Sequence, residues 1–128
     1  MDTIRERLIS AAEQASKNSY SPYSEFAVGA AVLTKGEEVF CGTNIENASY
    51  GGTMCAERVA VFKALSEGKR EILAIAVYAE KALPYPCGMC LQVLSEFAAG
   101  SIPVYLKSRA ESKDIFLSDL LPYPFCKG

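Results

Sequence analysis

The sequence predicts an α/β fold, a three-layer α-β-α sandwich around a mixed sheet of about five strands, within a single domain over residues 1–128. Helical patterns alternate along the chain with short apolar segments. Two of these segments are joined by a tight turn, and a third is apolar at nearly every position, as in a strand buried on both faces. Half of the 128 residues are hydrophobic, so a sizeable core is possible.

The first half of the chain predicts a helix followed by a β-hairpin. Residues 2–16 carry apolar side chains at helical spacing between charged ones. A polar loop over residues 18–24 contains a proline that breaks the helix. Residues 26–33 and 38–42 are apolar and flank the tight turn at residues 35–37, so we expect them to pair as two strands.

The second half alternates between helices and strands after a polar loop at residues 44–53, which is a position where ligands often bind. We expect helices at 54–66 and 88–98 and strands at 72–79, 102–106 and 114–117. Ser118 is expected to cap a last helical turn that ends before Pro122. The helix side chains expected in the core are Ala60, Phe62, Leu65, Leu91, Leu94 and Phe97.

Composition restricts the possible partners and location. Lys and Arg total 13 and Asp and Glu total 15, so the net charge is −2, and no basic patch suggests nucleic-acid binding. No apolar run is long enough for a membrane span, and the N-terminus carries no signal segment. The number of cysteines, five, is odd. We therefore expect a cytoplasmic protein with reduced thiols and without a membrane or nucleic-acid partner.

Three cysteines form a candidate catalytic zinc site. Cys55 begins one expected helix, and Cys87 and Cys90 begin another, where helix N-termini stabilise thiolates. Because the chain has no His, a zinc site must use cysteine or carboxylate ligands. Three protein ligands leave a fourth position open, which is typical of catalytic zinc. Glu57 follows the first ligand by two residues and could transfer protons to and from an activated water.

Three thiolates carry more negative charge than one zinc ion cancels. Arg58, next to Glu57, is the expected cationic donor to the sulfurs. Two other interpretations of the cysteines remain open. Cys87 and Cys90 could be a redox pair, or a fourth thiolate from Cys41 or Cys126 could complete a structural zinc site. We expect instead that Cys41 and Cys126 are small buried hydrophobic residues.

Several separated motifs resemble the zinc-dependent nucleoside deaminases, and within them the small homotetrameric cytidine deaminases. Two of them contain the cysteines, namely Thr53-Met54-Cys55-Ala56-Glu57-Arg58 and Pro86-Cys87-Gly88-Met89-Cys90. The others are Ser21-Pro22-Tyr23-Ser24, Phe26-Ala27-Val28-Gly29-Ala30, Asn44-Ile45-Glu46-Asn47-Ala48 and Leu120-Leu121-Pro122. The resemblance covers nearly the whole chain and implies a cytidine deaminase-like fold.

The resemblance implies deamination of cytidine and 2′-deoxycytidine in pyrimidine salvage. The cysteines would hold one Zn²⁺ per subunit, an activated water would attack C4, and Glu57 would transfer the protons. The implied substrate-binding residues are Phe26, Asn44, Glu46, Ala56 and Phe125. Phe125 would stack on the base, often across a subunit boundary of a homotetramer, and Tyr50 would reach a neighbouring site. Gln92 would orient Arg58.

Two departures from the family pattern concern the fine geometry and the substrate. Leu91 stands where the family commonly has Arg, and the segment 122–125 is bulkier than usual before the aromatic residue. A deaminase of a related cytosine nucleoside such as blasticidin S is therefore an alternative. A non-catalytic zinc module is a second alternative, and polynucleotide editing is disfavoured by the acidic chain.

Overall fold

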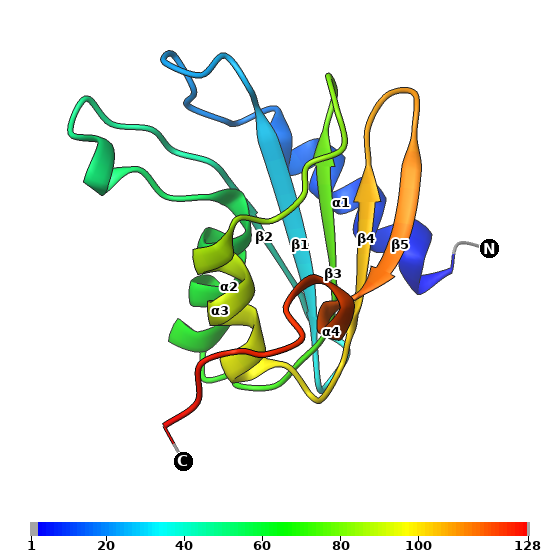
Figure 1. Cartoon of the computed structure of the whole chain (residues 1–128). Helices are drawn as coiled ribbons and strands as arrows, with labels where there is room; N and C mark the ends of the chain where they lie inside the picture. The colour runs from blue at the N-terminus through cyan, green and yellow to red at the C-terminus, as the bar shows by residue number, and fades with distance from the viewer. Residues whose placement is uncertain (1–2, 128) are drawn as a thin grey trace.

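The computed structural model describes residues 3–127 and contains a mixed five-stranded sheet with helices on both faces (Figure 1). The strands run in the order β2-β1-β3-β4-β5. Strands β3 and β4 are parallel, and the other neighbouring pairs are antiparallel. Their bounds are β1 Val28–Thr34, β2 Val39–Thr43, β3 Ile72–Ala79, β4 Pro103–Lys107 and β5 Ser112–Phe116. The predicted three-layer α/β architecture is confirmed.

The helices form the two outer layers. Helix α1 (Ile4–Ser16) packs on one face, with its own cluster of buried side chains against the sheet. Helices α2 (Ala56–Ser66) and α3 (Gly88–Phe97) cover the other face, where the larger core cluster lies (Figure 1). A single turn, α4 (Leu117–Leu120), follows β5. No helix within residues 3–127 has both the length and the apolar character needed to cross a membrane.

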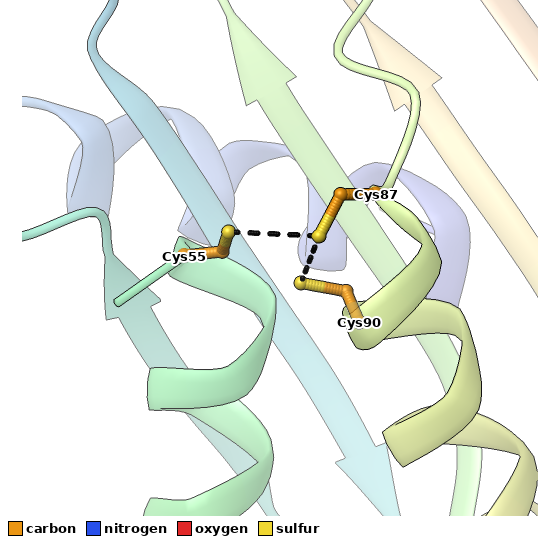
Figure 2. Close-up of side chains that lie close together, drawn as sticks. All are labelled: Cys55, Cys87 and Cys90. Atoms are coloured by element: carbon orange, nitrogen blue, oxygen red, sulfur yellow. Dashed lines mark hydrogen bonds between the residues drawn. The ribbon is translucent and has the colours of Figure 1, made fainter. Parts of the chain in front are cut away.

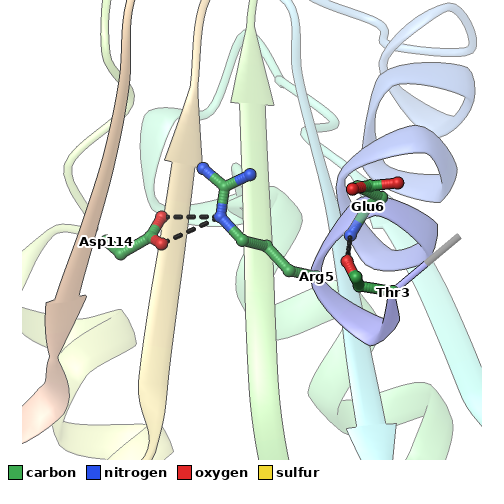
Figure 3. Close-up of polar contacts among 4 residues, drawn as sticks. All are labelled: Thr3, Arg5, Glu6 and Asp114. Carbon is green, nitrogen blue, oxygen red and sulfur yellow. Dashed lines mark hydrogen bonds and ion pairs between the residues drawn. The ribbon is translucent and has the colours of Figure 1, made fainter.

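Polar contacts hold the beginning of α1 against the sheet (Figure 3). The Thr3 hydroxyl accepts a hydrogen bond from the Glu6 N–H and caps the helix. Arg5 Nε lies 3.0 and 2.8 Å from the two carboxylate oxygens of Asp114 in β5. The Arg5 guanidinium also lies 5.8 Å from the ring centroid of Tyr105 in β4. These contacts link α1 to the strands farthest from β2.

The core confirms most, but not all, of the expected buried side chains. Leu91 and Leu94 of α3 are buried, and Ala60 of α2 is fully buried. Leu65 and Phe97 are partly buried against the same cluster. Phe62 is 41% exposed, so its predicted burial is wrong. The buried stripe of α2 follows the helical spacing 56, 60, 64, and a residue two positions after Ala60 points to the opposite side.

Long-range contacts move several element boundaries. The first strand begins at Val28 rather than at residue 26, because the Asn44 side chain bonds the Phe26 carbonyl and the Val28 N–H. Met54 pairs with Ile45 in an isolated bridge, so α2 begins two residues later than predicted. Residues 50–52 form a short 3-10 helix inside the expected loop, and the last strand covers 112–116.

Two further predictions concern Ser118, which the structure places differently, and the start of the first helix. Ser118 lies inside α4 and does not cap it, because Phe116 occupies the N-cap position. Its N–H instead donates to the Ser101 hydroxyl. The predicted start of the first helix at residue 2 falls outside the described residues.

Candidate active site

The N-terminal ends of α2 and α3 bring three sulfur atoms together (Figure 2). Cys55 is the N-cap residue of α2, Cys87 is the N-cap residue of α3, and Cys90 lies in the first turn of α3. The Sγ atoms are 3.8 Å apart for Cys55 and Cys87 and 3.5 Å apart for Cys87 and Cys90. All three sulfur atoms lie within 4.8 Å of one another.

This spacing fits a tetrahedral zinc ion. Zn–S bonds of about 2.3 Å at tetrahedral angles put two ligand sulfurs about 3.8 Å apart. Cys41 lies in β2 and Cys126 is exposed in the C-terminal segment, and neither joins the cluster found in residues 3–127. The structure therefore does not assemble a four-thiolate site, and three ligands leave one zinc position open. The expected burial of Cys126 is wrong, and Cys41 is half-buried.

The thiols and Arg58 form a polarised cluster. The pKa of Cys55 is lowered to about 5, first because Cys90 donates a hydrogen bond to its sulfur and then because Arg58 does. The pKa of Cys90 is raised, because its proton is held in that bond and because the thiol is buried. Arg58 Nη2 lies 3.4 Å from Cys55 Sγ. The cluster thus favours thiolate character at the N-terminus of α2.

Glu57 is a buried carboxyl group beside the sulfurs. Its side chain is 5% exposed and lies in the first turn of α2. Burial raises the pKa of Glu57 to about 7, and the nearby negative charge of Cys55 acts in the same direction. A carboxyl group with this pKa can both accept and donate a proton near neutral pH.

A cavity of about 220 Å³ connects these groups with the expected substrate contacts. Its lining includes the predicted site residues Phe26, Asn44, Glu46, Cys55, Ala56, Glu57 and Cys87. Sequence reasoning missed Tyr85 in this lining, although its place two residues before Cys87 was a usable signal. A larger cavity of about 640 Å³ lies between α1, β2 and α2, but it contains none of the predicted catalytic or zinc-ligand residues. We therefore identify the smaller cavity as the candidate active site, because it contains the predicted catalytic residue and two of the predicted zinc ligands although its volume is smaller.

Asn44 and Glu46 are buried and fully oriented by neighbouring groups. Asn44 Nδ2 donates to the Phe26 carbonyl at 2.8 Å, and Asn44 Oδ1 accepts from the Val28 N–H at 3.0 Å. Glu46 Oε1 accepts from the main-chain N–H groups of Tyr23 and Ser24 at 2.9 and 3.1 Å. The hydrogen bond from the Ser24 hydroxyl lowers the pKa of Glu46, and the two main-chain bonds act in the same direction. Sequence reasoning missed these partners, which lie more than 15 residues away in sequence.

Four other residues of interest lie outside this cavity. Phe125 is 73% exposed, and its main chain is held by the Gln92 amide through bonds of 3.0 and 3.1 Å. Gln92 was expected to orient Arg58, but its amide bonds Phe125, and the buried Arg58 Nε has no hydrogen-bond partner within residues 3–127. Tyr50 is 76% exposed and meets Tyr23 edge to face. Leu91, which stands where the family commonly has Arg, packs into the hydrophobic core.

A three-layer α/β sandwich with an open three-thiolate site beside a buried carboxyl group defines a zinc-dependent hydrolytic enzyme. A family model described as cytidine and deoxycytidylate deaminase zinc-binding region matches residues 2–106. The chain belongs to this family, which confirms the predicted enzyme class and the predicted zinc cofactor.

Individual relatives agree with this assignment. A cytidine deaminase of Halalkalibacterium halodurans is 50% identical over 123 residues, covering 94% of this chain and 93% of the relative. A cytidine deaminase of Sporosarcina psychrophila is 45% identical over 124 residues, covering 95% and 91%. The crystal structure of cytidine deaminase from Burkholderia pseudomallei matches with a TM-score of 0.89 and 43% identity, covering 97% of this chain and 100% of that one.

Proposed function

We propose that this protein, acting as one domain over residues 1–128, deaminates cytidine and 2′-deoxycytidine to uridine and 2′-deoxyuridine in pyrimidine salvage. The observation that carries the proposal is one cavity in which the buried Glu57 and the ligands Cys55 and Cys87 meet the polar pair Asn44 and Glu46. Relatives that are 45% and 50% identical and named cytidine deaminase support the same substrate.

Glu57 is the proposed proton carrier. Hydrolysis forms a bond from water oxygen to C4 and breaks the bond from C4 to the amine. The two protons of the water must therefore reach ring N3 and the departing ammonia. A carboxylate in the cavity wall next to Cys55 is suited to accept the first proton, deliver it to N3, and then carry the second proton to the amine.

Cys55, Cys87 and Cys90 are the proposed ligands of one zinc ion per subunit. Bound there, zinc supplies the Lewis acidity that makes water a nucleophile at neutral pH. The Arg58 guanidinium, 3.4 Å from Cys55 Sγ, offsets part of the negative charge of the thiolates and holds that sulfur in place.

The remaining lining residues are proposed to hold the nucleoside. Asn44 and Glu46 bind ribose hydroxyls, because a buried amide and a buried carboxylate together offer a donor and an acceptor. Phe26 packs beside the nucleoside, and the main chain at Ala56 contacts the amino and ring edge of the base. Their position in the same cavity as Glu57 supports these roles.

An assay of substrate choice tests the function. We expect the purified zinc-loaded protein to change the ultraviolet absorbance of cytidine and 2′-deoxycytidine and to release ammonia from both. Cytosine, adenosine and blasticidin S should react much more slowly. Preferential turnover of blasticidin S would support the alternative substrate instead, and no ammonia from any of these compounds would overturn the proposal.

A variant separates catalysis from mere zinc binding. Glu57→Gln should lower kcat by about 10²–10⁴-fold, which is the usual contribution of a general acid–base group, while the zinc content stays near one per chain. A non-catalytic zinc module predicts no turnover by the wild type either. Equal turnover by the wild type and the variant would exclude the proposed role of Glu57.

We also propose a homotetramer in which Phe125 of one copy stacks on the base in a neighbouring site and Tyr50 reaches a neighbouring site. Both side chains are largely exposed on the single chain, and neither lines its active-site cavity. Light scattering of the purified protein should give the mass of four chains, and a monomer with full activity would contradict the assembly.

Subunit mixing tests the role of Phe125 directly. Phe125→Ala and Glu57→Gln should each be weakly active alone. When the two are unfolded and refolded together, a subunit with intact Glu57 can receive Phe125 from its neighbour, so activity should rise above the sum of the separate proteins. If the mixed subunits assemble without a gain in activity, Phe125 acts in the active site of its own chain.

A cytoplasmic location is proposed because the chain keeps all five cysteines as free thiols. We propose neither a membrane nor a nucleic-acid partner, in agreement with the net charge of −2. Activity found in the soluble cytoplasmic fraction of gently lysed cells would support this location, and activity in a secreted fraction would contradict it.

A further inference from the structure

The Ser24 hydroxyl connects two parts of the candidate active site. It donates a hydrogen bond to Glu46 Oε2 and accepts one from the Phe26 N–H at 3.1 Å. Glu46 and Phe26 both line the cavity that contains Glu57, whereas Ser24 does not. Ser24 lines instead a second cavity, which shares Glu46 with the first. It therefore contacts the groups that face the ligand without facing the ligand itself.

We propose that Ser24 is a positioning residue for the sugar side of the site, because its hydroxyl fixes the Glu46 carboxylate in one orientation. This proposal rests on the proposed function. It concerns how tightly a sugar hydroxyl is held rather than the chemical step at C4.

Counting hydrogen-bond sites gives the physical reason. Each oxygen of a carboxylate can accept about two hydrogen bonds. Glu46 Oε1 already accepts two main-chain N–H bonds, from Tyr23 and Ser24. Glu46 Oε2 accepts the Ser24 hydroxyl, which leaves about one acceptor position for a sugar hydroxyl. Removing the Ser24 hydroxyl leaves Oε2 to be satisfied by water, so a ligand hydroxyl must compete for a less well oriented oxygen.

The loop has other supports that do not need this hydroxyl. The Glu25 N–H donates to the Ser21 carbonyl at 3.0 Å, and Lys81 Nζ donates to the Glu25 carbonyl at 2.6 Å. The main-chain N–H of Ser24 remains available to Glu46 after any substitution of its side chain. We therefore expect loss of the hydroxyl to change the orientation of the carboxylate more than the path of the loop.

The test compares substrates with and without the 2′- and 3′-hydroxyls of the sugar. Ser24→Ala should raise the KM for cytidine about 3- to 10-fold, as expected for the loss of one hydrogen bond, with little change in kcat. The KM for 2′,3′-dideoxycytidine, which lacks the 2′- and 3′-hydroxyls and keeps only the 5′-hydroxyl, should change less than about twofold, because the two hydroxyls on the ring that Glu46 is proposed to hold are absent. Ser21→Ala is the matched control, because the Ser21 hydroxyl bonds Ser19 and not Glu46.

Two further comparisons isolate the hydroxyl and its route of action. Ser24→Thr should keep the wild-type KM and Ser24→Val should not, because these side chains have the same shape and differ in the hydroxyl. In a Glu46→Gln background, Ser24→Ala should add little to the KM for cytidine, because Ser24 acts through that carboxylate. Zinc content and melting temperature are measured for every variant.

The outcomes separate this proposal from the proposed function. An equal loss on cytidine and dideoxycytidine, or full additivity with Glu46→Gln, would overturn the positioning role while leaving deamination intact. Equal KM values for Ser24→Thr and Ser24→Val would overturn it as well. A zinc-loaded wild type that releases no ammonia from cytidine would overturn the proposed function, and the Ser24 proposal with it.

Discussion

Gly42 of β2 allows α2 to lie close enough to the sheet to set the position of Cys55. A Cβ atom added at Gly42 would lie 2.5 Å from the Ala60 nitrogen and 2.7 Å from the Ala56 oxygen. Extending these contacts to an ordinary distance of about 3.4 Å requires α2 to move by about 0.7–0.9 Å. Metal–ligand distances tolerate only about 0.2 Å, so the moved Cys55 sulfur can no longer share a zinc ion well with α3.

We therefore expect Gly42→Ala to weaken zinc binding specifically. Overpacking costs about 1–3 kcal/mol, and if this strain is relieved at the metal site, zinc affinity falls about 5- to 150-fold. A competition titration against a chromophoric chelator at fixed pH measures the zinc affinity, and turnover of cytidine at saturating zinc measures the activity.

Two other glycines supply the controls. A Cβ atom at Gly29 would meet the Ala12 carbonyl oxygen of α1 at 1.9 Å, so Gly29→Ala should destabilise the fold strongly from the opposite face of the sheet. The zinc affinity of its folded fraction should nevertheless stay near that of the wild type. Gly88, next to Cys87, has open space, and Gly88→Ala should change neither property. Wild-type zinc affinity in Gly42→Ala, or an equal loss in Gly29→Ala, would refute the reasoning.

Three more predictions concern single contacts. Arg58→Gln should lower zinc affinity by about 10- to 100-fold, since it removes the hydrogen-bond donor to Cys55. Unchanged zinc affinity in a chelator titration together with unchanged turnover would contradict this role of Arg58. Leu94→Ala should lower the free energy of unfolding by about 2–5 kcal/mol, measured by urea denaturation, because this side chain is fully buried; a cost below about 1 kcal/mol would contradict the packing. Arg5→Ala combined with Asp114→Ala should give a coupling energy below about 1 kcal/mol that declines with salt, because both side chains are partly exposed. A salt-independent coupling would show that solvent does not screen the pair.

The cluster of three cysteines could be predicted because local sequence determines most of it. Cys87 and Cys90 are three residues apart at the beginning of one helix, and this spacing alone brings their sulfurs together. Cys55 has the equivalent capping position on α2, and Glu57 follows within the same helical turn. The local sequence does not show that the two helix ends pack side by side. Support for that arrangement came from the resemblance to known deaminases.

The contacts that orient the other site residues depend on tertiary structure and have no local signal. Ser24 and Glu46 are 22 residues apart, and Gln92 and Phe125 are 33 apart, so nothing in either segment indicates its partner. Gln92 illustrates this, because the resemblance to known deaminases implied a role for it at Arg58. Its amide instead holds the main chain of Phe125. Nearness in sequence predicts a contact on the same face of one helix, but it cannot predict which distant segment satisfies a polar side chain.

Small residues determine how closely α2 packs on the sheet, and this role could be recognised only from the structure. The stripe Ala56, Ala60 and Ala64 faces the sheet, and Gly42 lies opposite its first two members. Apart from Ala56, for which the resemblance implied a contact with the substrate, these residues were predicted as ordinary parts of a helix and a strand. Because none of them has a side chain larger than a methyl group, α2 can approach β2 closely, and that approach helps to place Cys55 beside the proposed ligands Cys87 and Cys90. The same close packing that makes the zinc geometry possible is the reason that one added methyl group at Gly42 should disturb it.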